Sequence, residues 1–458
     1  MKYKFSYYTI ISDPVNSRND VVLFATRSSK AFKIKEEVKN KLLENDVEDL
    51  DEALKEQLIK IKALVPADEK ELDTIVDENN AAIGSATELY EVIQPSAMCQ
   101  LGCDYCGQQH TKDYIQPAVY DKLLERIKLK LKMGDYKSLY IGWFGGEPLM
   151  GLRQIREISK ELIKLAAENN LKYGAKIVTN GLSLKPAIFR ELAQEMKIEQ
   201  VEITLDGIGE FHDHRRITKE GNATFDIIFQ NILDITSMPD YYDLGCRISL
   251  RCNVDHRNVE GVSPLIKLLA EHKLQNKLAY FYPIGVYSWG GNDAHQKSLT
   301  KEEFAELEIG WMIEMFENGF IPTLLPNRVK KVCMAVSSTS EMYDAFGNIF
   351  NCTEVSYTTH YNGTPYVLGN LKLDHTYVEK NRPLHDWYSN MKDSSPQKKF
   401  PCTTCKMLPV CGGGCPKSWH EDMRACPSAK FNIKDRLALS YVVAKSDIRE
   451  PELADTNE

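Results

Sequence analysis

The sequence predicts an α/β protein, built as a partial (β/α)6 TIM-like barrel between a small N-terminal α+β module and a cysteine-rich C-terminal domain. From residue 89 onward, six short β-rich runs alternate with amphipathic helical stretches, a pattern typical of βα units around a parallel sheet. Seven of the twelve cysteines follow Pro326, where the helical periodicity fades. We therefore expect domains at residues 1–85, 86–325 and 326–445, and a flexible charged tail at 446–458.

The N-terminal module is predicted from short strands and amphipathic helices. Leu50, Leu54 and Leu58 recur at a spacing of four, which places them on one helix face. The alternative is an irregular extension of the next domain. The expected strands cover residues 3–11 and 21–26, and the expected helices cover 32–43 and 50–64.

The barrel is predicted from six strand patterns, each followed by a helical one. Six units indicate an open, partial barrel rather than a complete eight-fold one. Thr300 and Glu303 form a capping box that opens a further helix over 301–318. The expected strands are 89–93, 138–144, 175–179, 200–205, 247–253 and 278–282. The helical stretches are 117–132, 152–168, 186–196, 225–235 and 259–272.

Composition excludes several classes of protein. The 458 residues are 43% hydrophobic and 27% charged, which excludes a disordered scaffold, and the net charge of −8 argues against nucleic acid or anionic lipid as a partner. No run approaches the ~20 apolar residues of a membrane span, and the N-terminus lacks a secretory pattern. We expect a cytoplasmic protein, whose thiols are kept reduced and serve metal binding or catalysis rather than disulfides.

Cys99, Cys103 and Cys106 follow the first expected barrel strand within one eight-residue loop. Three thiolates can hold three corners of a four-iron, four-sulfur cube, whereas an ordinary structural cluster takes four cysteines. One iron would stay open, and an open metal position is generally reactive. The alternative is a zinc site with His110 as the fourth ligand.

Glycines, amides and carboxylates stand where the expected strands end, which is the face that carries chemistry in barrel enzymes. Glycine pairs let a ligand approach the backbone, and the polar side chains can accept hydrogen bonds from amino or ribose groups. Taken singly, each of these motifs also fits an ordinary turn. The motifs are Gly145-Gly146-Glu147-Pro148, Asn180-Gly181, Asp206-Gly207 and Asp255.

The three cysteines, with Tyr105 before the last of them and Gly145-Gly146-Glu147-Pro148 downstream, resemble the radical S-adenosylmethionine superfamily over about residues 89–430. The resemblance implies that the open iron binds S-adenosylmethionine, whose cleavage yields a 5′-deoxyadenosyl radical. It also implies that Gly145, Gly146 and Glu147 hold the methionyl amino group of the cofactor.

By the same resemblance, Thr179, Asn180 and Asp206 line the cofactor pocket, and Arg216 pairs with the cofactor carboxylate. Two histidines precede this arginine in the segment 211–216. For His212 and His214, solvated loop residues or an adventitious metal site are competing interpretations.

The C-terminal cysteines resemble a SPASM extension, which usually holds two auxiliary iron-sulfur clusters. Asn327 stands where some members supply an eighth cysteine, so one cluster would have a non-cysteine ligand or an open iron. With the first group this gives three [4Fe-4S] clusters and leaves Cys246 and Cys252 as expected core residues. The implied ligands are Cys402, Cys405, Cys411 and Cys426 for one auxiliary cluster and Cys333, Cys352 and Cys415 for the other.

The resemblance implies a peptide-modifying maturase that forms a thioether or carbon-carbon cross-link in a ribosomally made precursor peptide. Residues 1–85 have the size of the family's winged-helix-like module, which binds the leader segment of such a peptide. A ferredoxin or flavodoxin is the expected type of reductant. The enzymatic alternative is formylglycine formation in a sulfatase, whose enzymes place a catalytic Asp after the cysteine that corresponds to Cys352. Thr353 and Glu354 stand here instead, and only Glu354 could substitute as the catalytic acid or base.

A third hypothesis belongs to another class, namely an iron-sulfur electron carrier or a zinc-binding protein without radical chemistry. Iron and sulfide contents near zero, with stoichiometric zinc, would favour the zinc-binding protein.

Overall fold

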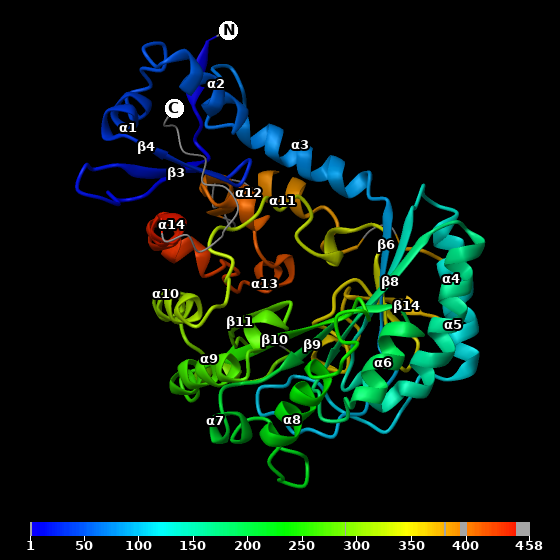
Figure 1. Cartoon of the computed structure of the whole chain (residues 1–458). Helices are drawn as coiled ribbons and strands as arrows, with labels where there is room; N and C mark the ends of the chain where they lie inside the picture. Colours follow the sequence, from blue (N-terminus) through cyan, green and yellow to red (C-terminus); the bar gives the residue numbers. More distant parts are fainter. Residues whose placement is uncertain (1, 289, 380–381, 394–400, 446–458) are drawn as a thin grey trace.

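The computed structural model describes residues 2–288, 290–379, 382–393 and 401–445, so the predicted tail lies outside the described residues. A nine-stranded sheet forms the centre of the molecule, in the order β11-β10-β9-β8-β7-β6-β12-β13-β14 (Figure 1). The six strands β6 to β11 run parallel and follow one another in chain order, and all six were predicted. They are β6 (Glu88–Ile93), β7 (Ser138–Trp143), β8 (Lys172–Thr179), β9 (Ile198–Thr204), β10 (Arg247–Val254) and β11 (Tyr280–Gly285).

Helices cover the outer face of this sheet, as the alternating pattern predicts (Figure 1). Their apolar stripes and the strands share one large core, which includes Trp143, Phe189 and Ile203. Thr300 and Glu303 form the predicted capping box. The helices are α4 (Pro117–Leu131), α5 (Leu152–Glu168), α6 (Pro186–Gln194), α7 (Glu210–Asp213), α8 (Phe225–Thr236), α9 (Val262–Glu271) and α10 (Lys301–Glu317).

The predicted domain boundary at residue 325 divides one continuous sheet. The C-terminal region adds β12 (Glu341–Tyr343), β13 (Asn348–Phe350) and β14 (Val367–Asn370), and β12 pairs in parallel with β6. Glu341 fastens this joint, because its buried carboxylate accepts hydrogen bonds from Arg126, Lys130 and Arg382. Polar contacts between segments far apart in the sequence carry no periodic signal, which is why the pattern did not predict this extension.

The N-terminal module is an α+β unit, but its elements differ from those expected. Residues 3–11 form two strands instead of one, because the chain turns at Ser6, whose amide donates to the carbonyl of Ala63. Residues 32–34 are strand rather than helix, since Phe32 and Ile34 pair with β3. The elements are β1 (Tyr3–Phe5), β2 (Thr9–Ile11), β3 (Val21–Ala25), β4 (Lys30–Ile34), α1 (Glu36–Leu43), α2 (Glu52–Lys60), β5 (Leu64–Pro66) and α3 (Glu71–Gly84).

The C-terminal region is more helical than its sequence pattern indicates. The long helix α14 (Ala429–Lys445) packs against α10, and its residues Ile433 and Leu437 share a core with Val22 and Phe24 of β3. Asn432 departs from helical geometry inside α14, and this kink interrupts the apolar periodicity. Three shorter helices precede it, namely α11 (Trp387–Asp393), α12 (Leu408–Cys411) and α13 (Pro416–His420).

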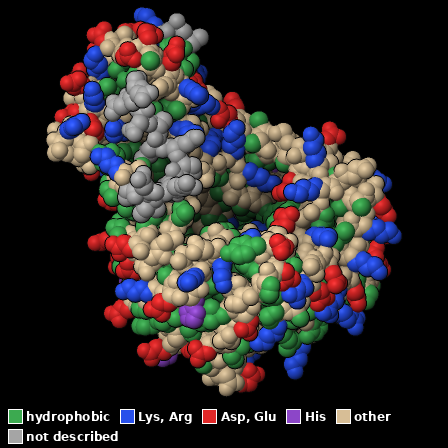
Figure 2. Space-filling view, in the orientation of Figure 1, with side chains coloured by type: hydrophobic (Ala, Val, Ile, Leu, Met, Phe, Trp, Pro, Cys, Tyr) green, Lys and Arg blue, Asp and Glu red, His purple; other side chains and the backbone are tan. Residues whose placement is uncertain are grey.

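In the part of the chain that the structure describes, no helix has the length and apolar character needed to cross a membrane. Figure 2 shows that the molecule is hollowed between the N-terminal module and the barrel.

Candidate active site

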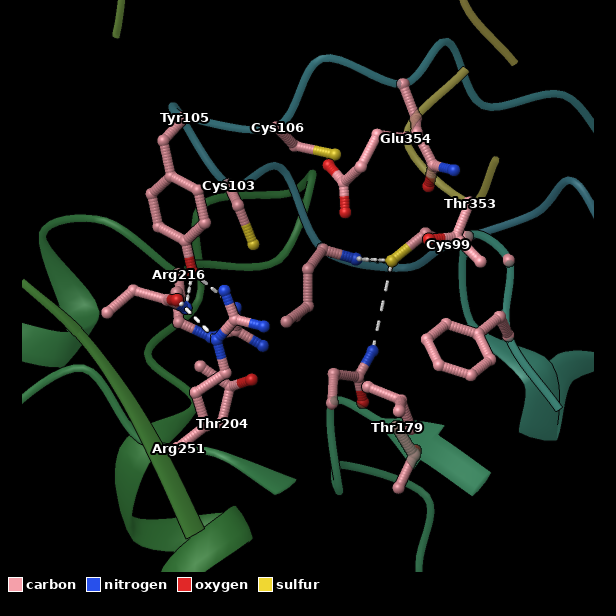
Figure 3. Close-up of a pocket in the computed structure, with 18 of the residues that line it drawn as sticks. Cys99, Cys103, Tyr105, Cys106, Thr179, Thr204, Arg216, Arg251, Thr353 and Glu354 are labelled. Atoms are coloured by element: carbon pink, nitrogen blue, oxygen red, sulfur yellow. Dashed lines mark hydrogen bonds between the residues drawn. The ribbon is translucent and has the colours of Figure 1, made fainter. Parts of the chain in front are cut away.

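A pocket lies at the carboxyl ends of the barrel strands, and the first three cysteines line it together (Figure 3). The loop that follows β6 carries Cys99, Cys103 and Cys106 and crosses the top of the sheet. It is fixed there by backbone hydrogen bonds, such as that from the amide of Gly102 to the carbonyl of Ile217. The structure therefore brings the predicted cysteines to the predicted face of the barrel.

The environment of these thiols suits sulfur that is bound to metal. The Leu101 amide donates to Cys99 Sγ at 3.4 Å, and Asn180 Nδ2 donates to it at 3.9 Å. Burial raises the pKa of the Cys99 thiol to about 11 and that of the Cys103 thiol to about 12. Thiolates in so buried a place need a positive partner, and a coordinated metal deprotonates its thiols. The donor set thus fits an iron-sulfur cluster.

The arrangement does not form a site for a single ion. Among the described residues, no three His, Cys, Asp or Glu side chains converge on one metal position. His110 does line the pocket, and its buried Nε2 has no hydrogen-bond partner. Burial lowers the pKa of His110 to about 4. The zinc alternative with His110 as fourth ligand is therefore not supported by this geometry.

Gly145 and Gly146 line the pocket and let the loop after β7 pack against the cysteine loop. Gly145 has φ +126°, and a Cβ on Gly146 would lie 2.7 Å from the carbonyl oxygen of Met98. Real Cβ atoms do not approach an oxygen so closely, so any side chain would push the two loops apart. The glycine pair is thus required for the shape of this wall.

Glu147 and Pro148 stand behind the wall rather than in it. The Glu147 carboxylate is fully buried and accepts hydrogen bonds from Thr179 Oγ1 at 2.6 Å and from the amides of Asn180 and Leu149. Burial raises the pKa of Glu147, although these hydrogen bonds oppose the shift. The side chain joins the loops after β7 and β8, and Pro148 begins the next short helix. Thr179 and Asn180 themselves line the pocket.

Tyr105 is the centre of a buried polar cluster on the other side of the pocket. Its hydroxyl donates to Asp206 Oδ2 at 2.6 Å and accepts from Arg216 Nη1 at 2.6 Å and Asn253 Nδ2 at 3.2 Å. Tyr105 and Arg216 line the pocket, whereas Asp206 lies outside the wall and holds Tyr105, which in turn bonds Arg216. Burial raises the pKa of Tyr105, so the hydroxyl stays protonated and can donate.

The two histidines of segment 211–216 do not form a metal site. His212 is fully buried, where its Nδ1 accepts from the Asp206 amide at 3.1 Å and its Nε2 faces Thr224 Oγ1. Burial lowers the pKa of His212 to about 3. Asp255 is also structural, because Arg215 and Arg257 surround it. Cys246 and Cys252 are fully buried in the core, as expected.

The remaining wall contains residues that the sequence motifs did not reveal. Arg251 and Asn253 alternate along β10, so the inward-facing positions of this strand could have identified them, while most of the others lie at or just after strand ends. Glu354 reaches the pocket from the C-terminal region, and Arg251 rises toward it from β10 (Figure 3). The newly found residues are Gln94, Leu101, Gln108, Phe144, Val178, Thr204, Arg251, Asn253, Gly285, Val286 and Tyr287, in addition to Thr353.

The C-terminal cysteines lie in two places in the structure. Cys402, Cys405, Cys411 and Cys426 line one cavity. Cys333, Cys352 and Cys415 lie within electrostatic reach of one another. Burial is the main cause that raises the pKa of Cys352, and the nearby Glu354, Cys333 and Cys415 add to the shift. This second group therefore adjoins Glu354 and the main pocket.

A cysteine loop, a glycine pair and polar groups at the strand ends define an α/β domain with its site on the carboxyl face of the sheet. Residues 93–238 match the model of the Radical SAM superfamily. This part of the chain is a radical SAM domain, and the chain has the corresponding α/β fold with a mostly parallel central sheet.

Several curated and solved proteins are similar to the chain over most of its length. A serine-type anaerobic sulfatase-maturating enzyme from Bacteroides thetaiotaomicron is 23% identical over 368 residues, which cover 73% of this chain and 84% of that protein. The structure of anSMEcpe with bound AdoMet superposes with a TM-score of 0.56 at 18% identity and covers 78% of this chain and 97% of that one. Streptococcus suis SuiB bound to the precursor peptide SuiA gives a TM-score of 0.51 at 14% identity, with coverage of 93% and 98%. At these identities the two structures show a shared fold.

Proposed function

We propose that this chain is a radical S-adenosylmethionine maturase that forms a thioether or carbon-carbon cross-link in a ribosomally made precursor peptide. The observation that carries the proposal is the meeting of Cys99, Cys103 and Cys106 with Gly145 and Gly146 in one pocket. The similarity to a sulfatase-maturating enzyme and to a structure that holds a precursor peptide supports a protein or peptide as the substrate.

Each part of the site has a role in this proposal. The three cysteines would hold a four-iron cluster with one iron left to the amino and carboxylate groups of S-adenosylmethionine. When bound, the cluster would supply an electron and S-adenosylmethionine would supply the 5′-deoxyadenosyl radical. Gly145 and Gly146 give the cofactor room to approach the backbone, while Thr179 and Asn180 offer polar contacts. Arg216, oriented by Tyr105, presents a fixed cation to the cofactor carboxylate.

Glu354 is the proposed base that takes a proton from the substrate. Its carboxylate faces the interior of the pocket toward the cysteine loop (Figure 3). Neither a hydrogen bond nor an ion pair engages it within the described part of the chain, so its oxygens are free to accept a proton. It lies beside Cys352, so a proton and an electron could leave the substrate toward the same side of the pocket.

The C-terminal region is proposed to be a SPASM domain with two auxiliary clusters. Cys402, Cys405, Cys411 and Cys426 would hold one, and Cys333, Cys352 and Cys415 the other. The second group adjoins the main pocket and would accept the electron released from the substrate. A ferredoxin or flavodoxin would supply the electron that starts each turnover.

The N-terminal module is the proposed binding site for the leader segment of the precursor. Its antiparallel sheet has the order β2-β3-β4, which leaves β4 at an edge. An edge strand can bind an extended peptide through main-chain hydrogen bonds. Residues 1–85 would thus recognise the leader, residues 86–325 carry out the chemistry, and residues 326–445 hold the auxiliary clusters.

The test is cofactor cleavage by the anaerobically reconstituted protein. With a chemical reductant and S-adenosylmethionine we expect 5′-deoxyadenosine, and with the precursor peptide a product lighter by two hydrogens per cross-link. Turnover with a small metabolite and never with a peptide would contradict the peptide part of the proposal.

Formylglycine formation in a sulfatase is the second candidate, and the similarity to the sulfatase-maturating enzyme favours it. Sulfatase-maturating enzymes are expected to carry an Asp directly after the cysteine that corresponds to Cys352. This chain has Thr353 there, which argues against formylglycine formation. Product mass separates cross-linking from formylglycine formation on cysteine, because only the latter removes sulfur. Formylglycine formation on serine removes two hydrogens, as a cross-link does, so in that case reaction of the new aldehyde with a hydrazide separates the two.

A further inference from the structure

Arg251 is a half-buried cation in the pocket wall that has no anionic partner within the described part of the chain. It belongs to β10, where it pairs in register with Thr204 of β9 and Tyr282 of β11. Its guanidinium forms no ion pair, and its Nη1 and Nη2 donate no hydrogen bond within the described part of the chain. Partial removal of a charge from water without a partner is costly, so a site that keeps such a charge generally uses it.

The orientation of this guanidinium is fixed by the fold. Arg251 Nε donates to Asn253 Oδ1 at 2.8 Å, and Asn253 Nδ2 in turn donates to the Tyr105 hydroxyl at 3.2 Å. The bond from Nε holds the plane of the guanidinium and leaves the two terminal nitrogens toward the pocket (Figure 3). Two parallel N–H groups in this arrangement match the two oxygens of a carboxylate.

The nearby carboxylates do not use these nitrogens. Glu202 accepts a hydrogen bond from the Tyr282 hydroxyl at 3.0 Å, and Glu354 faces the cysteine loop from the opposite wall. Both are near enough to act on Arg251 electrostatically, but neither forms an ion pair with it. The other arginine of the pocket, Arg216, is oriented by the Tyr105 hydroxyl and is the proposed partner of the cofactor carboxylate.

We propose that Arg251 binds a carboxylate of the substrate, so that the enzyme selects peptides with an acidic side chain at or beside the modified residue. This inference rests on the proposed function, because it takes the substrate to be a peptide. The ion pair would hold the peptide in the barrel interior, with Glu354 on the far side of the bound segment. Arg251 is thus a specificity-determining residue.

Two tripeptide probes test this inference without any turnover. The reconstituted holoenzyme with S-adenosylmethionine is titrated with acetyl-Gly-Glu-Gly-amide and with acetyl-Gly-Gln-Gly-amide, and binding is followed by ligand-observed NMR. We expect the glutamate probe to bind about tenfold more tightly, because a charge-assisted hydrogen-bond pair is lost with glutamine. Equal binding of the two probes to the wild-type enzyme would overturn the proposal, whatever any variant does.

The variants assign the preference to this side chain. Arg251→Gln should abolish the preference and Arg251→Lys should keep part of it. Arg247→Gln, on the same strand but packed on Tyr241 and Tyr242, should leave it unchanged. A preference that survives in Arg251→Gln would contradict the proposal. So would a loss of S-adenosylmethionine affinity at unchanged iron content, because Arg251 would then serve the cofactor. Cofactor cleavage without peptide tests the proposed function separately.

Discussion

The pocket of the first three cysteines and the cavity of Cys402, Cys405, Cys411 and Cys426 differ in what surrounds the sulfur. The first is open and polar, with Arg216, Arg251 and Glu354 in its wall. The second is lined by apolar side chains such as Met407 and Leu408. Residues of the N-terminal module, among them Tyr8 and Ile75, pack into the same apolar core as Cys402.

This difference shows how one chain can use cysteine thiolates both at a reactive site and at a site that holds an unreactive cluster. An open polar site allows a charged cofactor and a substrate to enter and leave. A closed apolar site restricts solvent and so controls the potential of a cluster rather than its reactivity. The barrel and the C-terminal region are joined by the buried charges around Glu341. Each of the following predictions disturbs one part of the molecule.

Gly414→Ala should have the largest effect, because Gly414 directly precedes Cys415 of one auxiliary group and packs against Ala425, which precedes Cys426 of the other. Gly414 has φ +74°, and an added Cβ would lie 2.2 Å from the carbonyl oxygen of Ala425, one residue before Cys426. We expect a loss of about two thirds of the iron, which corresponds to the two auxiliary clusters, while S-adenosylmethionine cleavage persists. Metal analysis is the measurement. Gly310→Ala is the control, because its Cβ would meet no atom within 4 Å. Full iron content in Gly414→Ala would contradict the assignment.

Glu341→Gln should weaken the joint between the two regions by about 3–5 kcal/mol, because it leaves buried cations without their counter-charge. Glu341 accepts from Arg126 Nε at 2.7 Å and from Arg382 Nη2 at 2.7 Å, and all three side chains are buried. Chemical denaturation measures the free energy of unfolding. Glu168→Gln serves as control, since that carboxylate is exposed. A loss in Glu341→Gln no larger than in the control would refute the role of the joint.

His212→Gln should remove part of the acid sensitivity of the barrel. Burial holds the pKa of His212 at about 3 in the folded chain, against 6.5 as its ordinary value. Between these values the unfolded chain binds a proton that the folded chain does not, so stability is full above pH 6.5 and falls as the pH decreases. The expected loss at pH 5 is about 2 kcal/mol. Denaturation at pH 7 and pH 5 measures it, with the exposed His214→Gln as control. An unchanged pH dependence in His212→Gln would count against this account.

Thr300→Ala should have the smallest effect, about 1 kcal/mol, because it removes the cap of α10. Thr300→Ser keeps the hydroxyl that accepts from the Glu303 amide and should restore stability. Thermal denaturation compares the three proteins. Equal melting of all three would show that the capping box adds nothing here.

The repeating pattern predicted the barrel strands and the face that carries the site, because period and strand order are local properties of the sequence. The spacing of Cys99, Cys103 and Cys106 likewise indicated that these three thiols share one loop, whereas the grouping of the C-terminal cysteines was implied only by the resemblance. Glu147 was expected to line the pocket, but its carboxylate lies behind the pocket wall and bonds Thr179, Asn180 and Leu149. These partners come from different loops, so the sequence around Glu147 could not show them. Arg251 and β12 were missed because tertiary contacts, rather than neighbours in sequence, give them their places.

The most direct test is cofactor cleavage by Cys103→Ala beside Cys246→Ala under oxygen-free conditions. Both cysteines are in the barrel, but only Cys103 belongs to the loop that lines the pocket. We expect Cys246→Ala to form 5′-deoxyadenosine and Cys103→Ala to form none while it keeps the far-ultraviolet circular dichroism of the wild type. Undiminished 5′-deoxyadenosine from Cys103→Ala would contradict the account.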